Sequence, residues 1–143
     1  MKRWMLLFPL LPLLAGCFQD TASHSLGARD HAITLVRNQS FFWQSTIDLS
    51  VIITRMPVCN GGGGIKGLPE DSSFVLYKAP DEYPEPLMLL KIGERIFALS
   101  DQSCRLQEFE QAPDSLGEKL GTFRVEDDKF QFITGDGPAV GEG

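Results

Sequence analysis

The sequence predicts an all-β domain: a single antiparallel β-sandwich or small β-barrel of about seven strands. Apolar and polar residues alternate with period two in several short segments, as expected of strands that bury one face. Residues that favour turns (glycine, proline, asparagine, aspartate and serine) separate these segments at short intervals. No stretch of 10 residues shows the 3.6-residue spacing of an amphipathic helix.

The first strands are predicted in the first half of the chain. Residues 32–37 form a short strand that ends in a turn at residues 38–40. The clearest strand follows at residues 47–54, where every second residue is aliphatic and one face is therefore wholly apolar. Pro57 marks its end, because proline cannot donate a hydrogen bond to a neighbouring strand. The four consecutive glycines at 61–64 predict a loop.

Strand pairing is predicted most sharply in the second half. Residues 73–78 form a short strand, and the proline-rich residues 79–86 form an extended connection. Residues 87–92 and 95–100 form a hairpin across Gly93-Glu94, with Leu90 opposite Phe97. Because residues 87–90 are apolar on both faces, they are expected in a central strand.

The chain ends in a further strand and a second hairpin. Residues 104–110 are predicted as a strand, followed by a loop over residues 111–119. A two-residue turn at Asp127-Asp128 then places Phe123 opposite Phe132, so that apolar residues pair across the two strands. These assignments give a β-domain over residues 31–134 and a disordered, glycine-rich tail over residues 135–143.

The amino terminus carries a secretory signal. Lys2 and Arg3 precede an apolar run over residues 4–15, which ends in Leu14-Ala15-Gly16-Cys17. This ending resembles the lipobox of bacterial lipoproteins. The resemblance implies cleavage after Gly16, a diacylglycerol on the Cys17 sulfur and acylation of the new amino terminus. A transmembrane helix would need about 20 apolar residues, and prolines interrupt this shorter run.

The same resemblance predicts where the protein resides. Residue 18, directly after the lipidated cysteine, is Phe18 and not aspartate. In enteric-type bacteria aspartate there retains a lipoprotein in the inner membrane. The resemblance therefore implies the periplasmic face of the outer membrane, with the inner membrane as the less favoured alternative. Residues 1–16 are the expected signal peptide, and residues 17–30, which lack periodicity, are expected to be the lipidated terminus and a flexible tether.

The charge of the chain excludes some classes of partner. Of its 13 basic residues, Lys2 and Arg3 lie in the leader, so 11 remain against 19 acidic residues and the net charge of residues 17–143 is −8. Nucleic acid is excluded, because binding phosphates requires clustered lysine and arginine. Anionic headgroups should repel the domain, which leaves the acyl chains on Cys17 as its attachment. A basic periplasmic protein would be attracted.

Two cysteines remain once Cys17 takes lipid. Cys59 and Cys104 are expected to form one disulfide in an oxidising compartment. The alternative is a pair of redox or metal-binding thiols, but the close C-x-x-C spacing and a nearby histidine are both missing.

Few residues point to catalysis. The only histidines are His24, in the expected tether, and His31, and no Gly-x-Ser-x-Gly surrounds a serine. The acidic residues at 81–85 and 126–128 are explained by a solvated loop and a turn. We therefore expect no catalytic residues, no metal site and no cofactor, and we expect a protein that is not an enzyme.

Three adjacent aromatic residues, Phe41, Phe42 and Trp43, are the candidate contact with a partner. They cannot all point to one side of a strand, so at least one should face solvent, a partner or the acyl-chain interface. The alternative is that they fill a wide core and a corner of the sandwich. We predict a protein-binding module of the inhibitor or immunity type, since lysozyme inhibitors and immunity lipoproteins look similar in size, anchor and acidity. A structural lipoprotein of an envelope secretion or pilus assembly is the alternative.

Overall fold

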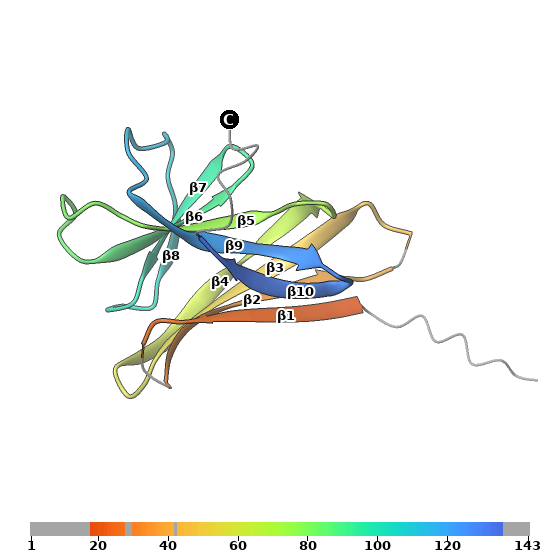
Figure 1. Ribbon diagram of the computed structural model, residues 1–143, viewed down its shortest axis with the longest axis horizontal. Coiled ribbons are helices and arrows are strands. Elements are labelled where there is room, and N and C mark those ends of the chain that lie inside the picture. Colours follow the sequence, from red (N-terminus) through yellow and green to blue (C-terminus); the bar gives the residue numbers. More distant parts are fainter. Residues whose placement is uncertain (1–17, 28–29, 42, 136–143) are drawn as a thin grey trace, which may run out of the picture.

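Two antiparallel sheets pack face to face in the computed structural model, which describes residues 18–27, 30–41 and 43–135 (Figure 1). These residues form no helix, and the sheets stay separate instead of closing into a barrel. The predicted all-β class and the sandwich are therefore confirmed.

The smaller sheet contains the first part of the chain, and the larger sheet contains the rest. In sheet order, the first consists of β1 (Phe18–Ser25), β2 (His31–Gln39), β3 (Thr46–Arg55) and β4 (Cys59–Pro69). The second consists of β10 (Lys129–Thr134), β9 (Glu118–Glu126), β5 (Phe74–Lys78), β6 (Leu87–Ile92), β7 (Arg95–Ser100) and β8 (Leu106–Glu108).

The main core lies between the sheets and follows the alternation seen in the sequence. In the β2–β3 ladder Ile33 pairs with Ile53 and Leu35 pairs with Val51, and all four side chains are buried. The large aromatic side chain of Phe74 faces them from the other sheet and is fully buried. Burial of such side chains contributes about 1.5–3 kcal/mol each to folding.

The two predicted hairpins are confirmed in register. Leu90 pairs with Phe97 across β6 and β7, and Phe123 pairs with Phe132 across β9 and β10. Gly93 has a φ of 61°, the left-handed conformation that the first position of the predicted turn requires.

Strand β6 is central, as its two apolar faces predict. It lies between β5 and β7, and it buries Leu90 in the main core. Leu89 points to the other face, where it forms a smaller core with Ile96 and Ala79. The connection before β6 and the segment after β8 supply Tyr83 and Phe109 to this second cluster, so both faces of β6 are covered.

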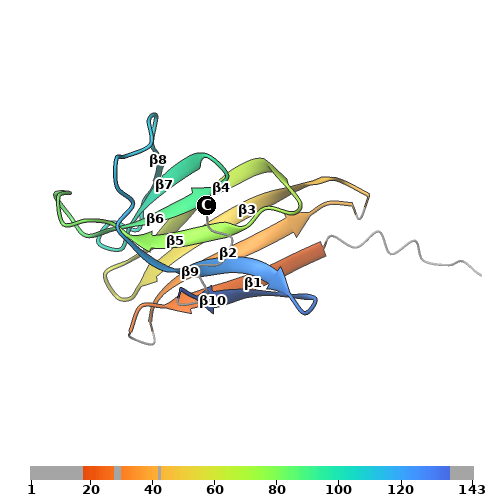
Figure 2. The same cartoon turned by 45° about the horizontal axis from the view of Figure 1, so that its top comes forward.

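The predicted flexible tether is wrong for residues 18–25, which form β1. This strand pairs with β2 along its whole length, from Phe18 opposite Gln39 to Ser25 opposite Ala32. Its sequence gives no strand signal because Ala22 is its only buried side chain. Backbone hydrogen bonds to the edge of β2 order it instead, and it lies beside β10 in both views (Figures 1 and 2).

The predicted loop at residues 61–64 is also wrong, because the glycines lie within β4. Gly61 pairs with Ile53 and Gly64 pairs with Ser50 in the β3–β4 ladder. A Cβ atom on Gly61 would lie 2.6 Å from the carbonyl oxygen of Cys104, so a bare backbone is needed where the other sheet approaches. With β1 and β4 included, the described part of the chain forms ten strands where about seven were predicted.

Two other boundaries differ from the prediction. The strand expected at residues 104–110 is shorter, since β8 covers only Leu106–Glu108 and Cys104 lies between the turn at residues 101–103 and this strand. Gly135 donates its N–H to the Leu120 carbonyl at 2.6 Å, and the remainder of the expected tail, residues 136–143, lies outside the described residues.

Candidate functional site

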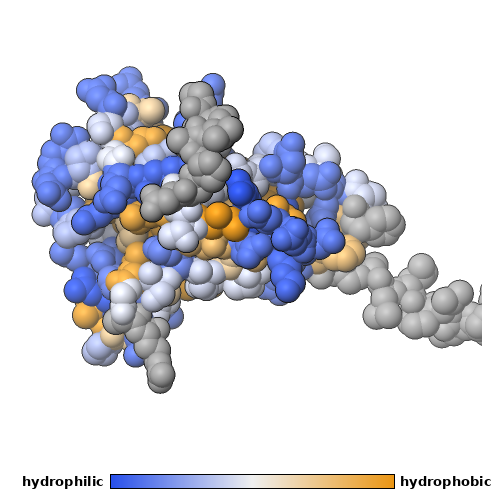
Figure 3. Space-filling view, viewed as in Figure 1, coloured by the Kyte–Doolittle hydropathy of each residue, from blue (hydrophilic) through white to orange (hydrophobic). Residues whose placement is uncertain are grey.

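A cleft of about 490 Å³ opens at one end of the sandwich. The end of β1 and the start of β2 form one wall, and the connection between β5 and β6, at the left of Figure 1, forms the other. Leu26, Leu87 and Leu120 give the cleft an apolar lining, while both histidines of the chain reach it. In Figure 3 hydrophobic side chains come to the surface among hydrophilic ones in this half of the molecule.

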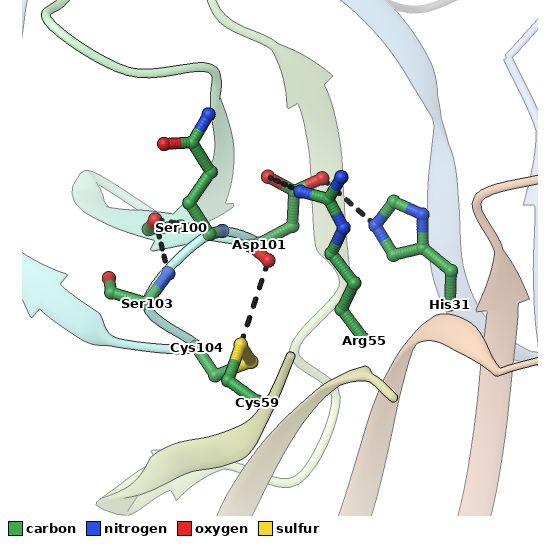
Figure 4. Close-up of polar contacts among 8 residues, drawn as sticks. His31, Arg55, Cys59, Ser100, Asp101, Ser103 and Cys104 are labelled. Carbon is green, nitrogen blue, oxygen red and sulfur yellow. Dashed lines mark hydrogen bonds and ion pairs between the residues drawn. A yellow bond between two sulfur atoms is a disulfide. The ribbon is translucent and has the colours of Figure 1, made fainter. Parts of the chain in front are cut away.

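A polar cluster joins the two sheets beside this cleft (Figure 4). The Nε2 atom of His31 lies 2.9 Å from Oδ2 of Asp101, and Nη1 of Arg55 lies 3.9 Å from Oδ1 of the same carboxylate. His31 and Arg55 are opposite each other at the ends of β2 and β3, whereas Asp101 follows β7 of the other sheet. Because a carboxylate accepts hydrogen bonds, Nε2 of His31 carries the hydrogen in this contact.

A tight turn holds Asp101 in place. The buried hydroxyl of Ser100 accepts hydrogen bonds from the backbone N–H groups of Gln102 and Ser103, both at 3.2 Å. Cys104 follows with a φ of 54° and forms a disulfide with Cys59, the first residue of β4. The carboxylate of Asp101 is thus positioned by its own turn and by the covalent link beside it.

His24 is the second histidine at the cleft. Its ring packs against Phe132 of β10, with 4.1 Å between the centroids and 35° between the planes. Burial lowers the pKa of the His24 imidazole below its ordinary value, because a charged ring loses hydration there. Burial of the half-exposed ring in the cleft wall therefore favours its uncharged form.

The chemistry of the cleft suits recognition of a basic group. Among the residues that the structure describes, the carboxylates of Asp81, Glu85 and Asp101 line it, against the single amine of Lys78. Among the described residues, no serine, threonine or cysteine side chain forms a hydrogen bond with His24 or His31. The His31–Asp101 pair is thus joined to Arg55 and not to a nucleophile, which makes it a clamp between the sheets.

The structure reports on most of the residues that the sequence singled out. The predicted disulfide between Cys59 and Cys104 is confirmed, with 5.8 Å between the Cα atoms. The expected lipidation site Cys17, the signal peptide over residues 1–16 and Phe42 lie outside the described residues.

The other two aromatic residues of the run lie at the surface, as predicted for at least one of the three. Phe41 is 41% exposed and Trp43 is 64% exposed. Their rings stack on each other with 4.7 Å between centroids and 17° between planes. Their contact with a partner stays a prediction.

Sequence reasoning missed the cleft and its polar cluster. His31 and Asp101 are 70 residues apart in the chain and come from different sheets. The spacing of residues in the sequence does not predict such a pair, because only the packing of the two sheets brings the two side chains together. The one available signal was that Asp101 directly follows a strand, at a place where loop residues gather at one end of a sandwich.

Within residues 18–27, 30–41 and 43–135, no group of three or more histidine, cysteine, aspartate or glutamate side chains is arranged to hold a metal ion. The same residues include no helix of sufficient length and apolarity to span a membrane.

The fold and the site together define a two-sheet antiparallel β-sandwich with an acidic cleft at one end. Comparisons with protein-family models, with curated proteins and with solved structures gave no match.

Proposed function

We propose that this protein is an outer-membrane lipoprotein that binds another periplasmic protein, in the manner of an inhibitor or immunity protein. Acyl chains on Cys17 hold it at the periplasmic face of the membrane, and two or more such chains give stable attachment. The cleft is the observation that carries the proposal, because its place and its chemistry both suit a protein partner.

The place of the cleft favours a partner in the periplasm. Phe18, next to the anchored cysteine, begins β1, and Ser25 at the other end of β1 lines the cleft. An antiparallel strand rises about 3.4 Å per residue, so roughly 24 Å separate these two ends. The anchor and the cleft thus lie at opposite ends of the sandwich, and the cleft is held away from the bilayer.

The chemistry of the cleft favours a basic side chain flanked by apolar groups. The carboxylates of Asp81 and Glu85 attract a lysine or arginine, while leucine side chains contact its neighbours. The turn after β3 adds apolar surface close by, with Met56 54% exposed and Val58 62% exposed. The net charge of −8 on residues 17–143 steers a basic partner toward the domain.

The proposal is tested by capture of a partner from a periplasmic extract on the immobilised protein, followed by kinetic measurements on the purified pair. In one variant Asp81→Lys and Glu85→Lys reverse the charge at the cleft. In a matched variant Asp71→Lys and Glu94→Lys make the same change in net charge at exposed sites that do not line it.

We expect the cleft variant to lose binding by about tenfold or more, mainly through slower association, because steering depends on local charge. The matched variant should bind like the wild type. Equal binding by both variants would contradict the assignment of the cleft, and turnover of an envelope substrate would contradict the binding function. Isolation only as part of a stable membrane assembly would favour a structural lipoprotein of a secretion or pilus system.

A further inference from the structure

Three exposed aromatic residues lie at the end of the sandwich opposite the cleft. Phe18 begins β1 and is 54% exposed. It is opposite Gln39, the last residue of β2, and the chain continues from there into the loop that carries Phe41 and Trp43. The strand register therefore places this loop beside the first residue of β1.

The loop is shaped so that it presents the rings outward. The N–H of Gln44 donates to the Phe41 carbonyl at 3.1 Å and closes a turn around the pair. The side-chain amide of Gln39 donates to the Gln44 carbonyl and ties this turn to the end of β2. On this turn the rings of Phe41 and Trp43 stack in parallel and remain exposed.

We propose that Phe18, Phe41 and Trp43 contact the headgroup region of the membrane in which the protein is anchored. The inference rests on the proposed lipid anchor at Cys17. Consecutive Cα atoms are about 3.8 Å apart, so an acylated Cys17 holds Phe18 at the bilayer surface. Tryptophan and other aromatic rings favour this interface, where an apolar ring meets a wet boundary.

The position of these residues favours a membrane over a protein as their partner. A protein bound to Phe41 and Trp43 would have to fit between the domain and the bilayer to which it is attached. The rings carry no charge and so are not themselves repelled by anionic headgroups, while the acyl anchor opposes the repulsion that acts on the acidic domain as a whole. Contact through uncharged rings also predicts little dependence on salt, in contrast with steering of a basic partner to the cleft.

The chain contains a natural probe for this contact. Its two tryptophans are Trp4, in the expected signal peptide, and Trp43, so residues 17–143 contain Trp43 alone. The acylated protein is reconstituted into vesicles of phosphatidylethanolamine and phosphatidylglycerol, with mass spectrometry to confirm the acyl chains on Cys17. Quenching of tryptophan emission is then measured with iodide in the water and with lipids brominated near the headgroups.

A matched variant moves the probe to the cleft end. In Trp43→Phe with Val58→Trp, the tryptophan lies at a position that is 62% exposed in the wild type, against 64% for Trp43. We expect a blue shift of Trp43 emission on anchoring, strong quenching by brominated lipid and a severalfold loss of quenching by iodide. Tryptophan at position 58 should remain open to iodide and insensitive to brominated lipid.

The outcomes separate this inference from the proposed function. Acylated protein whose Trp43 stays as open to iodide as that of the soluble Cys17→Ser variant would overturn the membrane contact alone. Loss of iodide quenching at Trp43 only on addition of a captured periplasmic protein, and not on anchoring to vesicles, would overturn it in favour of a protein contact. An unacylated Cys17 would overturn the lipid anchor, and the membrane contact with it.

Discussion

At the scale of single residues, His24 links the cleft to the pH of its surroundings. Its imidazole is half-buried against Phe132, and this burial lowers its pKa from the ordinary value of 6.5. In the unfolded chain the ring takes up a proton near pH 6.5, whereas in the folded protein it does so only at lower pH. Proton uptake as the pH falls below 6.5 therefore favours the unfolded state.

We predict that His24→Gln flattens the pH dependence of stability in this range. Uncharged His24 contributes its full share to the free energy of unfolding above the pKa that it has in the unfolded chain. This share is lost as the pH falls toward the lower pKa that His24 has in the folded protein. The check is the melting temperature of the wild type and the variant between about pH 7 and about pH 5.5, where carboxylates are still ionised. Parallel curves for the two proteins would contradict the role of His24.

At the scale of secondary-structure elements, β4 shows how closely one strand can approach its neighbour β3 in the same sheet. Gly62 has a φ of 136°, and a Cβ atom there would lie 1.8 Å from the carbonyl oxygen of Val51 in β3. Gly64, two residues further along the same strand, would place its Cβ 3.9 Å from the nearest atom, the Leu49 carbonyl oxygen. Only the first of these positions demands glycine.

We predict that Gly62→Ala lowers the free energy of unfolding by about 2 kcal/mol or more. Two destabilising effects combine there, because alanine is strained at this positive φ and its Cβ collides with the carbonyl oxygen of Val51. Gly64→Ala is the matched control, and it should change the same quantity by no more than about 0.5 kcal/mol. Urea unfolding of the two variants measures both effects. If Gly62→Ala leaves the free energy of unfolding unchanged, β4 and β3 can move apart at this point.

The same scale explains which strands the sequence predicts. β3 and the hairpin of β6 and β7 bury one face or both against a core, so their apolar residues follow a readable period. β1 is held by backbone pairing at the edge of a sheet, and β4 pairs with β3 through glycines that leave room for the backbone of Cys104 and of Val51. Side-chain periodicity carries no information about either cause, so both strands were missed.

At the scale of the whole molecule, the two sheets are joined at both edges of the sandwich. The Cys59–Cys104 disulfide connects the edge strand β4 to the segment between β7 and β8. On the opposite edge His24 of β1 packs on Phe132 of β10. The polar cluster around Asp101 adds a third connection at the cleft end.

We predict that Cys59→Ser with Cys104→Ser lowers the free energy of unfolding by about 4 kcal/mol, since the disulfide closes a loop of 45 residues. Denaturant unfolding of the variant measures this loss. Reduction of the wild type should lower the stability by a similar amount, which controls for effects of the serines. If neither the double substitution nor reduction changes the free energy of unfolding, the disulfide does not stabilise the fold.

The candidate site shows where sequence reasoning ends. The cysteine pair was predictable because only two thiols remain once Cys17 is assigned to lipid. Exposure of at least one ring in the aromatic run was predictable because three adjacent rings cannot all point to one side of a strand, but which rings are exposed was not. The cleft was not predictable, since its two walls come from β1 and from the connection before β6. Contacts of this kind depend on how the sheets pack, which no local pattern encodes.

The direct passage from residue 17 into β1 has a mechanical consequence. If Cys17 carries the proposed acyl anchor and the cleft holds the proposed protein partner, tension on the complex acts along the axis of β1. The hydrogen bonds between β1 and β2 run across that axis from Phe18 to Ser25, so they share the load in shear instead of opening one after another. Under that load, the edge strand that looks like a tether in the sequence would pass the force to β2 along the whole length of their pairing.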